Sequence, residues 1–158
     1  MKILMVCTGN ICRSPTAEGV LRKFLGDSSM HDRVQVDSAG THDYHCGEAP
    51  DRRAVQHAKR RGYDLSRLRA RQIQWRDFEE FDLLLAMDRG HLKMLQAHSP
   101  PQHRHKLKLY LEFAGLPDTD LPDPYYGGPD GFEQVLDAAE AASRGLLEYV
   151  RSYLRVST

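Results

Sequence analysis

The chain of 158 residues carries 22 Lys and Arg against 22 Asp and Glu, so its formal net charge is zero. A balanced charge gives no overall field that would attract nucleic acid or a membrane surface, and we expect neither as a partner. Three cysteines without regular spacing do not form a disulfide framework, and no apolar run approaches the length of a membrane span. We therefore expect one cytoplasmic domain over residues 1–158, with reduced thiols and no membrane insertion.

The first unit predicted along the chain is a strand, a tight loop and a helix. Residues 2–6 read KILMV, a short apolar run that is typical of a buried strand. Ser14 and Pro15 suit the cap and the first position of a helix, in which apolar residues then recur at three- and four-residue spacing as far as Leu25.

Three more strands and three more helices are expected after this unit. The strands are predicted over 34–38, 81–87 and 106–111, and the helices over 50–61, 91–98 and 132–154. Residues 115–131 are so rich in Gly, Pro and Asp that they indicate a functional loop. Alternating strands and helices predict an α/β fold: a four-stranded, mainly parallel sheet flanked by helices on both faces, with the ligand site at the carboxyl ends of the strands.

The loop between the first strand and the first helix reads CTGNICR over residues 7–13. Cys7 is placed beside the positive end of a helix dipole, which favours its thiolate. Gly9 and Asn10 allow the backbone to curl so that its N–H groups converge on one tetrahedral anion, and Arg13 can bind two oxygens of that anion at once. The chemistry indicated is attack of a thiolate on a phosphate monoester, with a phosphocysteine intermediate.

An acid is still needed to protonate the leaving oxygen, and the later functional loop contains a candidate. Asp123 lies between two prolines and just before two aromatic residues, in the stretch LPDPYYG. We expect its carboxyl to protonate the leaving group and then to act as base towards water. Tyr125 and Tyr126 can line a slot for a flat phenyl group.

These residues resemble a known family. The motif C-x5-R-S-P near the N-terminus, together with D-P-Y-Y near the C-terminus, is similar to the low-molecular-weight protein tyrosine phosphatases, and the likeness extends over nearly the whole chain through DSAGT at 37–41, ARQ at 70–72 and Met87-Asp88. The resemblance implies that Cys7 is the nucleophile, Arg13 the phosphate clamp and Asp123 the general acid. It also implies a substrate-binding set formed by Thr8, Gly9, Asn10, Ile11, Cys12, Ser14, Tyr44, Tyr125 and Tyr126.

Three finer roles follow from the same resemblance. Ser14 would hydrogen-bond the sulfur of Cys7, Ser38 would hold Asn10, and Tyr44 would form another wall of the entrance. Many members have a histidine near the position of Leu68 that helps to hold the loop asparagine, and this chain lacks it. No metal or organic cofactor is implied. Inorganic phosphate would be the product, and the substrate a phosphotyrosine protein such as, in a bacterium, a tyrosine kinase of polysaccharide export.

Several alternatives remain open at this point. Cys12 is either a redox partner that forms a reversible disulfide with Cys7 or a small residue that fills the loop.

The histidines near 42–45 and 98–105 read mostly as polar loop rather than as metal ligands, and the basic stretch of residues 52–71 reads mostly as a solvated face. Rival functions are an arsenate reductase, a phosphotyrosine-binding module and a phosphoarginine phosphatase; the apolar Ile11 favours an aryl ester over a guanidine.

Overall fold

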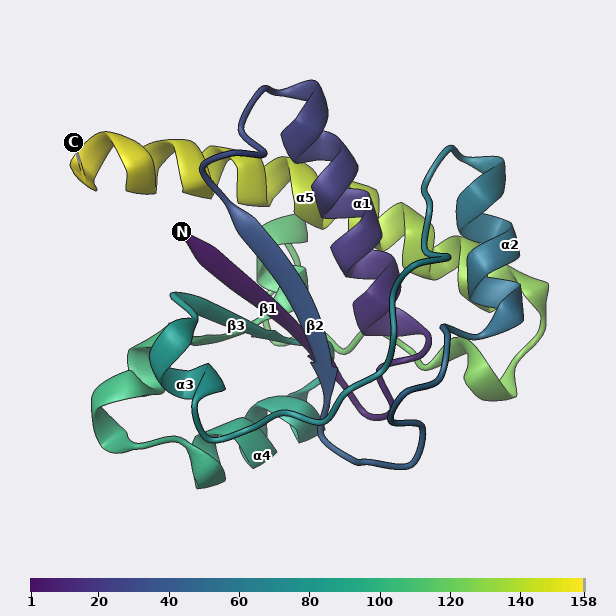
Figure 1. The fold of residues 1–158 in the computed structure, drawn as a ribbon, viewed down its shortest axis with the longest axis horizontal. Coiled ribbons are helices and arrows are strands. Elements are labelled where there is room, and N and C mark those ends of the chain that lie inside the picture. The colour runs from purple at the N-terminus through teal and green to yellow at the C-terminus, as the bar shows by residue number, and fades with distance from the viewer. Residues whose placement is uncertain (158) are drawn as a thin grey trace.

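The computed structural model describes residues 1–157 and contains one parallel sheet (Figure 1). Its strands lie in the order β2-β1-β3-β4, and all neighbouring strands are parallel. The predicted α/β fold with a four-stranded sheet is therefore confirmed, and the sheet is wholly parallel. The strands are β1 (Lys2–Cys7), β2 (Gln35–Gly40), β3 (Leu83–Ala86) and β4 (Leu107–Leu109).

Helices cover both faces of this sheet. On one face α1 and the long α5 pack side by side, with α2 beyond them, and on the other lie α3 and α4 (Figure 1). The α-helices are α1 (Arg13–Asp27), α2 (Arg52–Arg60), α3 (Asp77–Glu80), α4 (Arg89–His98) and α5 (Pro129–Ser157). Three short 3-10 helices complete the fold: η1 (Pro101–Lys106), η2 (Tyr110–Ala114) and η3 (Pro124–Tyr126).

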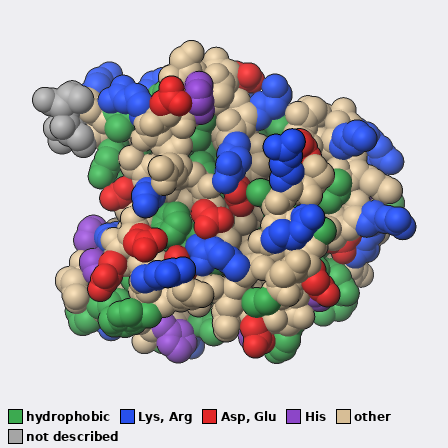
Figure 2. All heavy atoms as spheres, in the orientation of Figure 1, with side chains coloured by type: hydrophobic (Ala, Val, Ile, Leu, Met, Phe, Trp, Pro, Cys, Tyr) green, Lys and Arg blue, Asp and Glu red, His purple; other side chains and the backbone are tan. Residues whose placement is uncertain are grey.

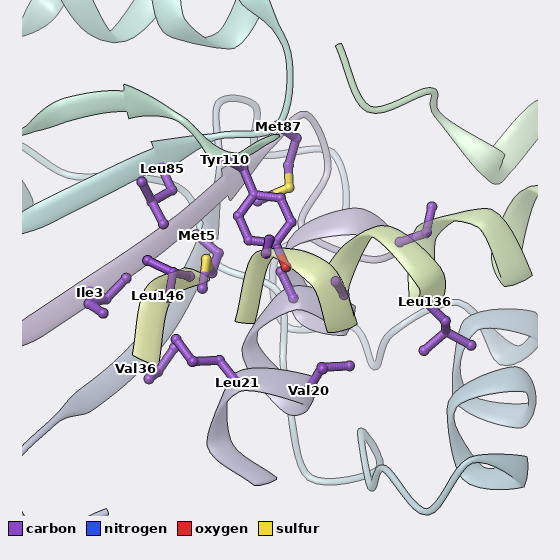
Figure 3. Close-up of a cluster of buried hydrophobic side chains, with 14 of the residues drawn as sticks. Ile3, Met5, Val20, Leu21, Val36, Leu85, Met87, Tyr110, Leu136 and Leu146 are labelled. Carbon is purple, nitrogen blue, oxygen red and sulfur yellow. The ribbon is translucent and has the colours of Figure 1, made fainter. Parts of the chain in front are cut away.

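The alternation of side chains along β1 explains why both faces are apolar. Ile3 and Met5 point to the core shared with α1 and α5, which Figure 3 shows, whereas Leu4 and Val6 belong to the cluster under α3 and α4. All four side chains are fully buried. A strand that is covered on both faces needs a continuous apolar run, which is the pattern that predicted β1.

The start of α1 differs from the prediction in a way that matters for the site. The helix begins at Arg13, and Cys12 precedes it without a side-chain cap. Ser14 therefore lies inside the first turn and is not the cap, because its hydroxyl is used by the loop before the helix. Pro15 still fits, since the first N–H groups of a helix have no partner within it.

The predicted functional loop is shorter than expected at its C-terminal end. Residues Pro124–Tyr126 form a 3-10 turn, and α5 already begins at Pro129, so that Gly131 lies within the helix. Two other features escaped the sequence pattern. The four-residue α3 and the 3-10 helix η2 are too short to show an amphipathic period.

A close approach of two backbones fixes β2 against the loop that follows β1. A Cβ atom at Gly40 would lie 2.6 Å from the carbonyl oxygen of Thr8, a distance that no side chain tolerates. The N–H of Thr41 donates to the carbonyl of Cys7 at 2.8 Å, and that of His42 donates to Thr8 at 3.1 Å. The end of β2 thus supports the first residues of the loop.

The surface carries both signs of charge. On the face in Figure 2 the Lys and Arg side chains are spread among Asp and Glu side chains rather than gathered into a field of one sign. Within the described residues no helix is long and apolar enough to cross a membrane.

Candidate active site

The loop from β1 to α1 forms the floor of a cavity of about 190 Å³ at the carboxyl end of the sheet. The walls come from the segment after β2 and from the turn η3. The lining residues are Cys7, Thr8, Gly9, Ile11, Cys12, Arg13, Tyr44, His45, Asp123, Tyr125 and Tyr126. The structure therefore brings together ten of the residues that the sequence singled out and adds His45, which the sequence analysis had read only as polar loop.

Ser14 and Asn10 lie behind the cavity, where they hold the sulfur of Cys7. The Oγ of Ser14 is 3.0 Å from the Sγ of Cys7, and it accepts a hydrogen bond of 2.8 Å from the Nδ2 of Asn10. Because Asn10 supplies a proton to the oxygen, the hydroxyl of Ser14 is free to donate its own proton to the sulfur. The predicted contact between Ser14 and Cys7 is present.

Asn10 is held by a different group from the one expected. It adopts a left-handed backbone with φ 59°, and its Oδ1 accepts the backbone N–H of Arg71 at 3.0 Å. The prediction that Ser38 holds Asn10 is wrong: the hydroxyl of Ser38 donates to the buried Glu18 at 2.7 Å. Asn10 is held by a backbone N–H, which does not depend on the side chain at position 68. The half-buried Leu68, which replaces the usual histidine, therefore does not remove this hydrogen bond.

The segment that carries Arg71 is itself fixed by charge. The guanidinium of Arg71 bonds Asp37 on β2 and the buried Asp77 at the start of α3, with its shortest contact to each at 3.0 Å. Its carbonyl accepts the N–H of Gly40 at 2.8 Å. Residues 70–72 are part of the family resemblance, but no pattern in the sequence shows that they contact the loop after β1.

Arg13 is buried, with 4% of its side chain exposed, and its Nη1 is fully used. That atom donates to the Oδ2 of Asp88 at 3.0 Å and to the carbonyl of Leu121 at 2.8 Å. The Nη2 lies 3.6 Å from the Oδ2 of Asp123. A guanidinium has five N–H donors, so those on Nε and Nη2 remain after Nη1 has used its two. Asp88, which orients this group, was not among the predicted site residues.

Asp123 is fixed at the start of η3 and remains accessible. Its Oδ1 accepts the backbone N–H of Tyr125 at 3.0 Å, and its side chain is 37% exposed. Pro124, at the first position of the turn, is buried and has no N–H to satisfy. The carboxyl is thus held at the rim of the cavity, with one oxygen towards Arg13.

Aromatic side chains form the rim. The rings of Tyr125 and Tyr126 meet edge to face with centroids 4.9 Å apart, and Tyr44 stacks on His42 at 4.9 Å. Tyr126 is 88% exposed. Exposed aromatic rings around a polar floor suit a ligand that has a flat apolar part and an anionic head.

Arg53 holds the Tyr125 side of this rim, although the sequence analysis had read it as part of a solvated face. Its Nη2 donates to the carbonyl of Tyr125 at 3.1 Å, and its guanidinium lies 5.5 Å from the centre of the Tyr125 ring and 4.8 Å from that of Phe132. Asp51 binds the same guanidinium through both carboxylate oxygens. A residue of α2 therefore sets the position of the turn that carries Asp123.

Cys12 is buried in the cavity wall. Burial raises the pKa of its thiol, and the neighbouring carboxylate of Asp51 and the sulfur of Cys7 raise it further, so the group is protonated at neutral pH. Both Cys7 and Cys12 are free thiols. Within residues 1–157 no group of three or more His, Cys, Asp and Glu side chains is arranged to hold a metal ion.

Comparison with known proteins agrees with this geometry. A family model described as low molecular weight phosphotyrosine protein phosphatase matches residues 2–155. The chain is 44% identical to a low molecular weight protein-tyrosine-phosphatase of Streptomyces coelicolor over 95% of this chain and 93% of the relative. A protein tyrosine phosphatase of Entamoeba histolytica superposes with a TM-score of 0.92 at 38% identity, covering 96% of this chain and 97% of that one. A Drosophila arginine phosphatase superposes with a TM-score of 0.87 at 32% identity, covering 95% and 98%.

Proposed function

Because the chain belongs to the low molecular weight phosphotyrosine protein phosphatase family, we propose that it hydrolyses phosphotyrosine monoesters in two steps through a phosphocysteine on Cys7. One observation carries the proposal: Cys7, Arg13 and Asp123, a nucleophile, an anion clamp and an acid, line one cavity although they come from opposite ends of the chain. Each has a role that this reaction requires.

In the first step the thiolate of Cys7 attacks phosphorus, and the bond from phosphorus to the tyrosine oxygen breaks. Arg13 binds two of the phosphoryl oxygens through Nε and Nη2, and the loop N–H groups bind the others. Asp123, protonated, gives its proton to the leaving oxygen, so tyrosine departs as a neutral phenol. The enzyme is left with a phosphocysteine and an ionised Asp123.

In the second step water attacks the phosphocysteine. Asp123 now removes a proton from that water, phosphate is released, and the thiolate of Cys7 is restored. The hydroxyl of Ser14, 3.0 Å from the sulfur, stabilises the negative charge as it returns to Cys7. The acid regains its proton, and the cycle needs no cofactor.

The cavity wall supports an aryl ester as the substrate. Ile11 places an apolar side chain in the cavity, and the rings of Tyr44, Tyr125 and Tyr126 stand around its mouth. A phenyl group gains contacts with such walls, whereas a charged guanidine would lose hydration without gaining a polar partner from Ile11. Because one structural relative is named an arginine phosphatase, phosphoarginine is the substrate against which this proposal is tested.

Trapping of the intermediate tests the mechanism. The enzyme is mixed with a phosphotyrosine peptide, quenched in acid within milliseconds, and digested for mass spectrometry. We expect phosphate on the peptide that contains Cys7. With a nitrophenyl phosphate, which needs no acid in the first step, we expect more of it when Asp123→Asn slows the second step. Phosphate on another residue, or release of phosphate by Cys7→Ser at the wild-type rate, would contradict the proposal.

A redox role for Cys12 is part of the same proposal. A peroxide oxidises the thiolate of Cys7 to a sulfenic acid, and the thiol of Cys12 displaces water from it to form a disulfide, which a reducing dithiol reverses. The raised pKa of Cys12 makes this attack slow. Without this disulfide a second equivalent of peroxide oxidises the sulfenic acid to a sulfinic acid, which dithiothreitol does not reduce. Activity lost to excess peroxide should therefore return with dithiothreitol in the wild type and not in Cys12→Ser.

A further inference from the structure

Thr8 and His91 meet behind the phosphate loop, and the mechanism above uses neither side chain. The Oγ1 of Thr8, the residue after the nucleophile, lies 2.7 Å from the Nε2 of His91, the third residue of α4. The imidazole is only 6% exposed. A histidine buried at this depth next to an anion site needs a reason, because both ring nitrogens must find partners.

The other ring nitrogen faces the carboxylate that orients Arg13. The Nδ1 of His91 lies 3.1 Å from the Oδ1 of Asp88, at an angle that does not make a well-formed hydrogen bond. The same Oδ1 accepts the backbone N–H of His91 at 2.8 Å, while Oδ2 accepts Nη1 of Arg13 at 3.0 Å. His91 is therefore one contact away from the phosphate clamp.

The groups that face the ring favour one position for the proton. A carboxylate oxygen can only accept, so the nitrogen that faces Asp88 is the protonated one. The Nε2 is then an acceptor, and the hydroxyl of Thr8 donates to it. Burial lowers the pKa of His91 to about 4, although the charge of Asp88 opposes this; Arg13, Asp123 and His42 are the other charged or titratable groups that face the ring. The imidazole is thus neutral at pH 7, in the Nδ1–H tautomer.

We propose that His91 is a positioning residue that locks the Asp88 carboxylate, and through it Arg13, to the phosphate loop at Thr8. One side chain then links the two parts of the anion site: the loop after β1 and the start of α4. Without it, the carboxylate keeps only backbone and arginine contacts and is free to turn about its own χ angles, taking the guanidinium with it. The inference rests on the proposed function only for the identity of the bound anion, which is a phosphoryl group.

The expected consequence is a loss of phosphate binding rather than of chemistry. Arg13 contacts the phosphoryl oxygens in the ground state and in the transition state alike, so weaker positioning raises KM and leaves kcat nearly unchanged. The dissociation constant for inorganic phosphate should rise by the same factor. Because the contact of Nδ1 with the carboxylate is less than a full charge-assisted hydrogen bond, we expect an effect of up to about tenfold.

Three substitutions separate the two contacts of the ring. The amide nitrogen of an asparagine occupies the place of Nδ1, so His91→Asn keeps the donor to Asp88 and loses Thr8. His91→Gln reaches towards Thr8 and loses Asp88, and His91→Leu removes both while filling the volume. Binding of inorganic phosphate is measured by calorimetry for each variant, and KM and kcat are measured with a phosphotyrosine peptide.

We expect KM and the phosphate dissociation constant to rise together in His91→Leu and His91→Gln, and to return towards the wild-type values in His91→Asn. Equal phosphate affinity in all four proteins would overturn the proposal, as would equal losses in the Asn and Leu variants. Because phosphate binding is measured without turnover, this outcome is distinct from failure of the proposed function, in which the wild type releases no phosphate from the peptide.

A spectroscopic measurement on the wild type tests the arrangement directly, with His91→Asn used only to assign the signals. Nitrogen-15 shifts of labelled histidine distinguish the two neutral tautomers. Of the ring signals, those lost in His91→Asn belong to His91, and at pH 7 they should report a protonated Nδ1 and an unprotonated Nε2. A protonated Nε2 or a charged ring would contradict the arrangement.

Discussion

The Nη2 of Arg13 lies 3.6 Å from the Oδ2 of Asp123, although one residue opens the first helix and the other precedes the last. The contact places the proposed acid directly beside the proposed phosphate clamp. A second contact holds the same segment to Arg13: the carbonyl of Leu121, two residues before Asp123, accepts a hydrogen bond from Nη1 at 2.8 Å. In the proposed mechanism, binding of the phosphoryl group and protonation of the leaving group are therefore coupled through one guanidinium.

The role of Asp123 predicts a dependence on the leaving group. Asp123→Asn should lower kcat/KM for phosphotyrosine by about 10²- to 10⁴-fold, the usual effect of losing a general acid. With a nitrophenyl ester the loss should be much smaller, because that oxygen leaves without a proton. The measurement is kcat/KM, which reports the first step alone, for a series of aryl phosphates whose leaving groups differ in pKa.

Asp120 provides the matched control for that series. It lies on the same loop but pairs with Arg89, at 3.1 Å, and does not line the cavity. Asp120→Asn should follow the wild-type series. If Asp123→Asn lost the same factor with every leaving group, the acid would have to be another residue.

The support of Asn10 gives a second prediction, in which the structure and the sequence pattern disagree. Asn10→Ala removes the bonds to Ser14 and to the N–H of Arg71, and should lower kcat/KM by at least tenfold because the loop loses its shape. Ser38→Ala instead leaves the buried Glu18 short of one donor and should lower the free energy of unfolding by about 1–3 kcal/mol with little effect on kcat/KM.

Steady-state kinetics and urea unfolding of the two variants make the comparison. The opposite result, with Ser38→Ala inactive and Asn10→Ala active, would show that Ser38 keeps the loop in shape and would contradict the role given to Asn10.

Arg53 should act on substrate affinity through Tyr125. Arg53→Ala removes the contact to the Tyr125 carbonyl and the packing on its ring, so the aromatic wall becomes mobile. KM for a phosphotyrosine peptide should rise about three- to tenfold, in the range of one cation–π contact and one exposed hydrogen bond, while inhibition by inorganic phosphate stays the same. Arg52→Ala, the neighbouring exposed residue of α2, should change neither quantity. A parallel rise in the phosphate inhibition constant would show that Arg53 acts on the loop instead.

The buried His91 predicts a pH dependence of stability. Its pKa is about 4 in the folded chain against 6.5 when exposed, so between these values the unfolded chain binds a proton that the folded chain does not. The free energy of unfolding is unaffected by this group above pH 6.5 and decreases as the pH falls from 6.5 to 4, by about 3 kcal/mol in all.

The free energy of unfolding in urea is measured at pH 7 and at pH 4.5 for the wild type and for His91→Asn. The difference isolates the contribution of His91, because both proteins have all other titratable groups. The wild type should lose about 2–3 kcal/mol more than the variant between the two pH values. Equal losses would mean that His91 is protonated in the folded protein.

The sequence predicted most of the fold because its strands are buried on both faces. Leu83, Leu84 and Leu85 form an uninterrupted apolar run, and such runs leave no other local interpretation when helices alternate with them. The start of α1 was misplaced by two residues because a serine before a proline usually caps a helix. Here the hydroxyl of Ser14 serves Cys7 and Asn10, which no local pattern can reveal.

The reacting groups of the site were predictable, and their supports were not. Cys7 and Arg13 are in one motif, and Asp123 stands out between two prolines. Asp88 and Arg71 act through contacts with residues more than sixty positions away, one through its side chain and the other through its backbone N–H. Spacing along the chain carries no information on such partners, and the family resemblance implied Ser38 where the fold uses Arg71.

The most direct test of the account is phosphate release from a phosphotyrosine peptide and a phosphoarginine peptide of the same sequence, each with the wild type and with Cys7→Ser. The account predicts release from phosphotyrosine by the wild type, none by Cys7→Ser, and at most slow release from phosphoarginine. Release mainly from phosphoarginine would contradict the aryl specificity assigned to the cavity walls, and release by Cys7→Ser would contradict the phosphocysteine mechanism.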